Sequence, residues 1–253
     1  MRLFSELNSV RRFHLGYWNL LVYVINNLKV LRLAPVEKLF HRQLQYSGLD
    51  AVYVIAIIAV LSGSLVISQV THFVGGDSEL TVKMLIWIVV REVGPLLSAM
   101  FIVARSSVSI ASELALMKVN REFEHLEYMG ISPLNYLVVP RVVGIALAVV
   151  VLTIYFQIVA VGGGLIISAL FQNTSFVQQA DRFLQIVSLT DLLLVIAKGF
   201  LFGITIAVIS CYHGFYSTPT HTGVSRAAVR AVSRSLMVVF ILDVVLSYLA
   251  GLL

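Results

Sequence analysis

Charged residues and cysteines are scarce in this sequence. Only 12% of its 253 residues are Asp, Glu, Lys or Arg, whereas 59% are hydrophobic, and the mean hydropathy is +0.94. Because soluble domains carry about 25% charged residues, this composition excludes an ordinary soluble fold. The single cysteine, Cys211, also excludes a disulfide framework within the chain and a metal site built from several cysteines.

Motifs of nucleotide hydrolysis and nucleophilic catalysis are absent as well. The sequence contains no GxxxxGK[ST] phosphate-binding loop, no HExxH and no GxSxG. His213 and His221 flank a turn-rich loop, and neither has the company of other metal ligands. We therefore expect no catalytic residue, no metal site and no cofactor bound by this chain. Binding or transport is favoured over catalysis.

Long apolar segments predict an all-α integral membrane protein. A hydrocarbon core about 30 Å thick requires roughly 20 apolar residues per helix. We expect five transmembrane helices, over residues 51–70, 84–117, 134–171, 192–212 and 236–253. The glycines at 162–164 predict either a bend in the third span or close packing against a neighbouring helix.

No linker rich in Pro, Ser or Gly divides the chain, so we expect one domain over residues 1–253. Within it, an N-terminal segment, 1–50, precedes the five-span region, 51–253. Residues 1–14 are mixed polar and the first apolar run lacks a small-residue cleavage site, so no cleavable signal peptide is expected.

Residues 15–39 form an amphipathic rather than a spanning pattern. Apolar side chains recur there at helical spacing, at Leu15, Trp18, Leu21, Val22, Ile25 and Leu28, with asparagines and Lys29 between them. This pattern predicts an N-terminal interfacial helix that lies in the cytoplasmic headgroup layer. A helix that packs against soluble protein is the alternative.

The distribution of positive charge predicts the orientation in the membrane. Segments 1–50, 118–141 and 213–234 carry thirteen Lys/Arg, whereas the loops expected on the other side carry only Lys83 and Arg182. Because positive residues concentrate on the cytoplasmic side, we expect a cytoplasmic N-terminus and an external C-terminus at Leu253. The same distribution explains the net charge of +5 without nucleic acid as a partner.

The second span contains ionisable residues, which are costly in a bilayer and usually face a protein interior or a cavity. An α-helix places six of its polar residues within a sector of about 100°: Arg91, Ser98, Arg105, Ser109, Ser112 and Glu113. Two interpretations remain open. These residues are ion-pair partners that fix helix packing, or Arg91 and Glu92 lie at the mouth of a cavity and bind a polar or anionic headgroup, which suits a bidentate guanidinium.

Two further charges lie in the later spans. Asp243 is expected either to be functional or to pair with Lys198 or Arg105 inside the membrane. Lys198 is expected to extend towards the outer headgroups.

A short amphipathic segment follows the second span. Val119, Phe123, Leu126 and Met129 share one helical face, and Gly130 and Pro133 end the segment as such residues end many helices. Its apolar face is too small to be stable alone, so it requires the membrane surface or a protein groove. The acidic residues around it favour a protein groove over anionic lipid.

Several blocks of this sequence resemble the MlaE/YrbE family of ABC-transporter permeases, over nearly all of the chain after residue 45. The resemblance is carried by Arg91–Leu96, Ala104-Arg105, Glu113-Leu114, Met117–Val119, Leu126–Gly130, Pro133, Tyr136–Arg141, Lys198, Phe202-Gly203, Cys211-Tyr212, Gly214, Gly223-Val224, Arg226-Ala227, Arg230–Val232 and Asp243. It departs from the family pattern at Ala104, Ser106, Ser107, Ala115, Arg121 and Ser132.

The resemblance implies a permease homodimer in the bacterial inner membrane that moves phospholipids to or from a periplasmic MCE-domain protein. A cytoplasmic ABC ATPase would hold the ATP and magnesium, and a small cytoplasmic regulatory subunit is a further possible partner. Asn120–Met129 would be the coupling helix, with ATPase-coupling residues Phe123, Glu124, Leu126, Glu127 and Met129. The substrate would meet Arg91, Glu92, Val66, Val70 and Phe73. Independently of the resemblance, the helical spacing described above predicts that Ser98, Arg105 and Glu113 belong to a buried polar stripe.

Two other functions remain as alternatives at this stage. A membrane scaffold would anchor a cytoplasmic partner without moving a substrate. An intramembrane enzyme is poorly supported because the sequence shows no catalytic cluster.

Overall fold

The fold is known from a computed structural model that describes residues 16–32, 52–74, 80, 83–84, 86–172 and 176–251. The described elements are helices, and five of them are long and apolar enough to cross a membrane, as predicted. They are α3 (Val52–Val74), the composite span Ile86–Val119, the span formed by η5 (Leu134–Val138) and α8 (Val139–Gln172), α10 (Leu189–Phe215) and α11 (His221–Gly251).

The second span is not one regular α-helix. It consists of η3 (Ile86–Val93), α5 (Gly94–Ile102), η4 (Val103–Ser107) and α6 (Val108–Val119), of which η3 and η4 are π-helical. The wider turns of a π-helix change the direction in which later side chains point. The carbonyl oxygen of Val90 in η3 accepts a hydrogen bond from the buried Nε2 of Gln157 in α8, at 3.1 Å. The bond supplies a partner to a carbonyl within the irregular stretch.

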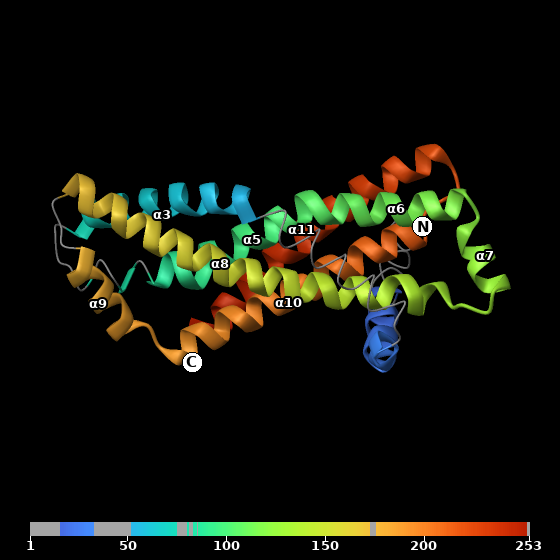
Figure 1. The fold of residues 1–253 in the computed structure, drawn as a ribbon, viewed down its shortest axis with the longest axis horizontal. Helices are drawn as coiled ribbons and strands as arrows, with labels where there is room; N and C mark the ends of the chain where they lie inside the picture. Colours follow the sequence, from blue (N-terminus) through green and yellow to red (C-terminus); the bar gives the residue numbers. More distant parts are fainter. Residues whose placement is uncertain are drawn as a thin grey trace, which may run out of the picture.

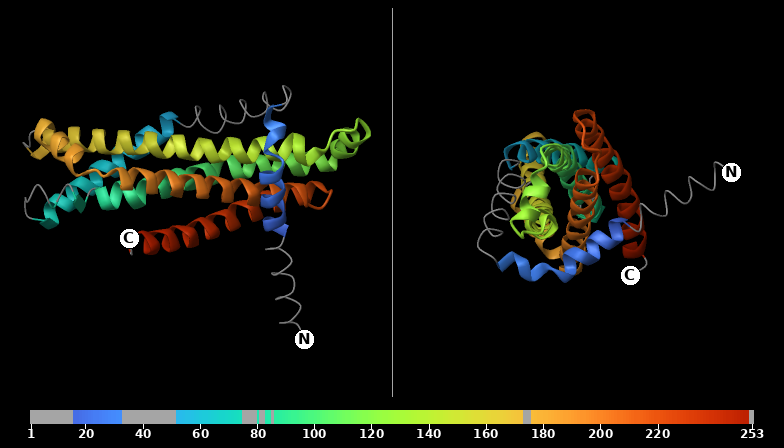
Figure 2. Two further views of the ribbon diagram at one scale, coloured as in Figure 1. Left: turned by 90° about the horizontal axis from the view of Figure 1, so that it is seen from below. Right: turned by 90° about the vertical axis from the view of Figure 1, so that its right-hand side faces the viewer.

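Glycines bring α3 and α8 into close contact. A Cβ at Gly63 would collide with the carbonyl oxygen of Ala160, and one at Gly164 would lie 2.6 Å from Cδ1 of Ile67. At Gly162, by contrast, a Cβ would meet no atom within 4 Å. Gly163 and Gly164 of the triplet therefore serve close packing of α8 on α3, and the two helices lie side by side in Figures 1 and 2.

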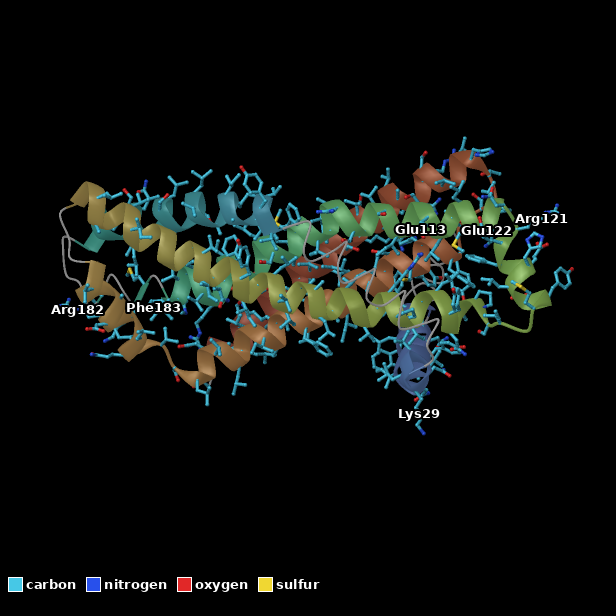
Figure 3. The ribbon with its side chains drawn as sticks, in the orientation of Figure 1. Lys29, Glu113, Arg121, Glu122, Arg182 and Phe183 are labelled. Carbon is cyan, nitrogen blue, oxygen red and sulfur yellow. The ribbon has the colours of Figure 1, made fainter. Side chains whose placement is uncertain are left out.

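The loops gather at two opposite ends of the bundle (Figure 1). The α7 end holds α7 (Glu122–Tyr128) and the connection from α10 to α11, and the α9 end holds α9 (Phe176–Ile186). Figure 3 shows Arg121 at the first end and Arg182 at the second. A loop was expected between the third and fourth spans, and the helix α9 corrects this expectation. Its polar side chains, such as Asp181 and Arg182, keep this helix from resembling a span.

The last span also differs from its prediction. α11 begins at His221, well before residue 236, and not inside the apolar run. Arg226, Arg230 and Arg234 make its first turns too polar to be recognised as membrane-spanning. Ala227 and Ala231, on the neighbouring face of the helix, are buried.

The N-terminal helix, residues 16–26, lies across the bundle instead of along it, and η1 (Leu28–Arg32) follows (Figure 2). Tyr23 attaches it to the start of the third span by donating to Oδ1 of Asn135 at 2.8 Å. Trp18 and Ile25 are exposed at 64% and 56%. These features agree with the predicted interfacial helix, of which residues 15 and 33–39 lie outside the described part of the chain.

Candidate functional site

Charges from three spans meet at one lysine. Lys198 of α10 is 1% exposed, and its Nζ donates to Glu92 Oε2 at 2.9 Å and to Asp243 Oδ1 at 3.2 Å. It also donates to Ser247 Oγ at 2.8 Å and to the carbonyl oxygen of Arg91 at 3.0 Å. The pairing of Asp243 with Lys198 confirms one of the predicted alternatives. The prediction that Lys198 extends to the headgroups is wrong, because two carboxylates and two neutral oxygens hold the ammonium inside.

We call this group the Lys198 cluster (Lys198, Glu92, Asp243 and Ser247), and Glu92 is its most accessible charged member. Its side chain is 33% exposed, whereas that of Asp243 is 12% exposed. The hydroxyl of Ser247 donates to Glu92 Oε2 at 2.6 Å, so this oxygen accepts from both Ser247 and Lys198. Charge-assisted hydrogen bonds of this length are the strong ones in proteins. The cluster therefore holds one carboxylate oxygen of Glu92 and leaves part of its side chain open to the surroundings.

Arg91 points to a different partner. Its Nε lies 3.0 Å from Oδ1 of Asp191, and its side chain is 25% exposed. The N–H is buried but lacks a well-aligned acceptor. Asp191 is itself fixed in the first turn of α10, where its Oδ2 accepts from the backbone N–H of Ser188 at 3.2 Å in a capping box. A guanidinium carries five N–H donors, so Arg91 retains donors for a further anionic group.

The structure contains features that support each of the two interpretations of Arg91 and Glu92. Arg91 and Glu92 do not pair with each other, and each forms an ion pair with another span, at Asp191 and Lys198 respectively. Each also keeps a quarter to a third of its side chain exposed, which contact with a headgroup requires.

The three α3 residues predicted to line the site share one helical face but differ in burial. Val70 is buried and Val66 is partly buried against the core, but Phe73 is 87% exposed.

The predicted polar stripe divides in the structure because the π-helical segments change the phase of the span. Ser98 is fully buried, and its hydroxyl has no partner among the described residues. Arg105 is half-buried. Glu113 is 56% exposed and lies 2.8 Å from Nη2 of Arg141, which is 8% exposed. Glu113 and Arg141 therefore join the second and third spans near the α7 end.

The segment predicted to be a coupling helix has one face on the bundle and one face free of it. Phe123 is buried, and its ring stacks on Phe215 with centroids 4.8 Å apart. Leu126 is also packed on the core. Glu124, Glu127 and Met129 point outwards, Met129 with 64% exposure. Phe123 and Leu126 thus hold α7 in place, and the other three are accessible to a partner.

A left-handed residue on each side limits the length of α7. Arg121 precedes the helix with φ of 57°, and Gly130 follows it with φ of 73°. The Gly130 N–H donates to the Glu127 oxygen and the Ile131 N–H to the Leu126 oxygen, both at 2.9 Å. This pair of backbone hydrogen bonds, with a left-handed glycine, is a common way for a helix to end. It turns the chain back towards the third span.

Sequence reasoning missed Asp191 and Ser247 as members of the site. The pattern Ser188-Leu-Thr-Asp191 is a capping signal that could have identified the start of α10, and with it the place of Asp191. Ser247 has no comparable signal, because only the approach of α11 to α10 gives it a role.

Comparisons with known proteins agree with this architecture. The family described as "Permease MlaE" matches residues 40–249. A probable ABC transporter permease protein of Rickettsia typhi is 30% identical over 208 residues, which cover 80% of this chain and 79% of the relative.

Two relatives that match a smaller share of the chain have more specific names. The intermembrane phospholipid transport system permease protein MlaE of Haemophilus influenzae is 27% identical over 158 residues, covering 62% of this chain and 60% of the relative. The chloroplastic protein trigalactosyldiacylglycerol 1 of Arabidopsis thaliana is 31% identical over 157 residues, which cover 62% of this chain and 45% of the relative.

Proposed function

This chain belongs to the MlaE permease family, and we propose that it moves phospholipids as the membrane subunit of an ABC transporter whose ATPase is a separate chain. The observation that carries the proposal is the pair Arg91 and Glu92, two partly exposed charges inside a membrane-spanning segment. Ionisable side chains within a membrane-spanning segment usually face a protein interior or a water-filled cavity, and a cavity leaves part of each side chain open. Charges that keep an open side suit a substrate with an apolar body and a charged end.

The phospholipid is favoured by two independent arguments. A relative at 27% identity is named as a phospholipid transport permease. In addition, the guanidinium of Arg91 has free donors that suit a phosphate, since guanidinium and phosphate form paired hydrogen bonds. Within the proposal, Arg91 meets the headgroup and the Lys198 cluster holds Glu92 beside it. Val66, Val70 and Phe73 remain candidates for the acyl chains.

We place the α7 end on the cytoplasmic side, with the ATPase on α7. The positive charges at this end support that side, including Arg226, Arg230 and Arg234 of α11. The outward-facing Glu124, Glu127 and Met129 are the proposed contacts. ATP and magnesium would bind to the ATPase, and this chain would bind neither. A small regulatory subunit remains a candidate at the same end.

The α9 end then faces the periplasm, where an MCE-domain protein would exchange lipid with the permease in the bacterial inner membrane. A homodimer completes the proposal, because five spans are few for a central lipid cavity. The apolar face of α11 offers a surface for the second copy, with Met237, Val244 and Tyr248 exposed at 65%, 68% and 71%.

Reconstitution tests the proposal. The chain, its ATPase and labelled phospholipid would be combined in vesicles, and lipid transfer to an acceptor would be followed with and without ATP. We expect transfer only with ATP and with an intact ATPase. An assembled complex that hydrolyses ATP without moving lipid would instead support the scaffold alternative.

A further inference from the structure

We propose that α10 transmits movement of α7 to the Lys198 cluster, and that Phe215 is the residue through which the movement enters. The inference rests on the proposed function, in which an ATPase acts on α7. α10 runs from Leu189 to Phe215 and so connects the cluster with the α7 end of the bundle (Figure 1).

Phe215 is held by α7, which lies in the predicted coupling segment, and by α6, which precedes that segment. Its ring lies almost parallel to that of Phe123 of α7, with an interplanar angle of 19° and centroids 4.8 Å apart. Its carbonyl oxygen accepts from Nζ of Lys118, in the last turn of α6, at 3.0 Å. The last carbonyls of a helix have no partner within that helix, and a lysine can supply one. Side chain and backbone of Phe215 are thus both fixed to the stretch that the ATPase would move.

The neighbouring turn of α10 is held from the other side. The hydroxyl of Tyr17 lies 2.7 Å from Nε2 of His213, and the Tyr17 ring lies edge-on to that of Tyr212 at 4.5 Å. Arg234 of α11 donates to the same Tyr17 oxygen at 3.0 Å. The end of α10 is therefore clamped between α7 and the N-terminal helix, so a shift of α7 cannot be absorbed by fraying of the last turn.

The body of α10 is suited to carry the shift further. Its span is one uninterrupted α-helix without proline, whereas the second span contains two π-helical segments. Glycine allows close contact with α8, since a Cβ at Gly203 would lie 2.6 Å from Cα of Ala146. Lys198 lies on the same helix, about 26 Å from Phe215 at a rise of 1.5 Å per residue.

The N-terminal half of α10 carries Lys198 and Asp191, which bind the charges of the proposed substrate site. Lys198 binds Glu92 of the second span and Asp243 of the last span, and Asp191 lies against Arg91. A displacement of α10 along or about its axis changes these contacts together. Phe215 is in this account a positioning residue, which acts on the substrate site through Lys198.

The test measures the amount of phospholipid transferred per ATP hydrolysed, in the assembled complex in vesicles. Phe215→Leu removes the ring stack but keeps an apolar side chain. We expect it to retain ATP hydrolysis and to lower the transfer per ATP by at least about fivefold, the lower end of typical couplings between distant sites. Phe200→Leu, on the same helix and 44% exposed, is the matched control and should leave the ratio unchanged.

A cross-link gives the rescue experiment. In Phe123→Cys/Phe215→Cys the ratio should fall, and a short bifunctional thiol reagent that joins the two residues should restore it, because the pair moves as one body. Cys211 is fully buried and need not be replaced. Lys118→Met, which removes the second contact, should also lower the ratio and serves as the test if Phe215→Leu fails to fold.

Two outcomes would overturn the inference. One is an unchanged ratio in Phe215→Leu and Lys118→Met, whether or not hydrolysis and transfer fall together. The other is a cross-link that blocks transfer. A wild-type complex that moves no lipid at all would contradict the proposed function instead, and this result would appear before any variant is compared.

Discussion

Nζ of Lys198 lies 2.9 Å from Oε2 of Glu92, across 106 residues of sequence, and the same nitrogen lies 3.2 Å from Asp243. Three spans therefore depend on one cation. Removal of one member of a buried ion pair leaves the other charge uncompensated, which costs more than the intact pair contributes. Single and compensating double substitutions in this cluster should thus have different effects.

Lys198→Met should lower the thermal stability of the purified chain in detergent, because Glu92 and Asp243 lose their common counter-ion. The loss of a buried partner costs about 3–5 kcal/mol. Lys198→Met/Glu92→Gln, which neutralises one of the two carboxylates, should recover part of the stability. Melting followed by size-exclusion chromatography measures both. A double variant no more stable than the single one would show that the charges are not coupled.

Gly63→Ala should destabilise the packing of α3 on α8, since its Cβ would collide with the carbonyl oxygen of Ala160. The control is Gly162→Ala on α8, where a Cβ meets nothing within 4 Å. It should be neutral or more stable by up to about 1 kcal/mol, because alanine favours helix. The same melting assay compares them, and equal effects of the two substitutions would contradict the observed packing.

Met129→Asp should weaken binding of the cytoplasmic ATPase by about tenfold or more, as loss of a central interface side chain commonly does. Met129 is 64% exposed and does not hold α7 on the bundle. Gln185→Asp, exposed on α9 at the opposite end, is the control. Affinity between the purified chains provides the measurement. Unchanged affinity of Met129→Asp would remove α7 from the ATPase interface.

Tyr17→Phe should release the N-terminal helix from the end of α10. The substitution removes the contacts to His213 and Arg234, whose net contribution is about 1 kcal/mol per hydrogen bond. Burial raises the pKa of the Tyr17 phenol above its usual value, so the hydroxyl keeps its proton at neutral pH. Hydrogen exchange over residues 16–26 should become faster in the variant. Unchanged exchange would mean that other contacts hold this helix.

The sequence predicted the number of spans and their approximate places, because lipid imposes a length and an apolar composition on each. The start of α11 was not predicted, because Arg226 and Arg230 make its first turns too polar to be recognised as part of a membrane span. The π-helical turns around Val90 and Arg105 were not predicted either, since the analysis of periodicity assumed a regular α-helix.

The partners of the site charges were only partly predictable. Asp243 was an expected partner of Lys198 because few ionisable residues lie in the spans, and ionised groups there seek one another. The contact of Arg91 with Asp191 was not predicted, because it depends on how α10 begins at Ser188 and on the phase of η3. Composition and spacing carry no information about either.

The most direct test of the account compares Arg91→Gln with Asp191→Asn in ATP-driven phospholipid transfer. Both substitutions break the ion pair, but the amide oxygen of an asparagine can still accept from the Ser188 N–H in the capping box. If Arg91 binds the headgroup, Arg91→Gln should lower transfer about tenfold or more, since a hydrogen bond to a charged group contributes about 1.5–3 kcal/mol, whereas Asp191→Asn should keep most of the transfer. Equal losses in the two variants would show that Arg91 serves only helix packing and would contradict the account.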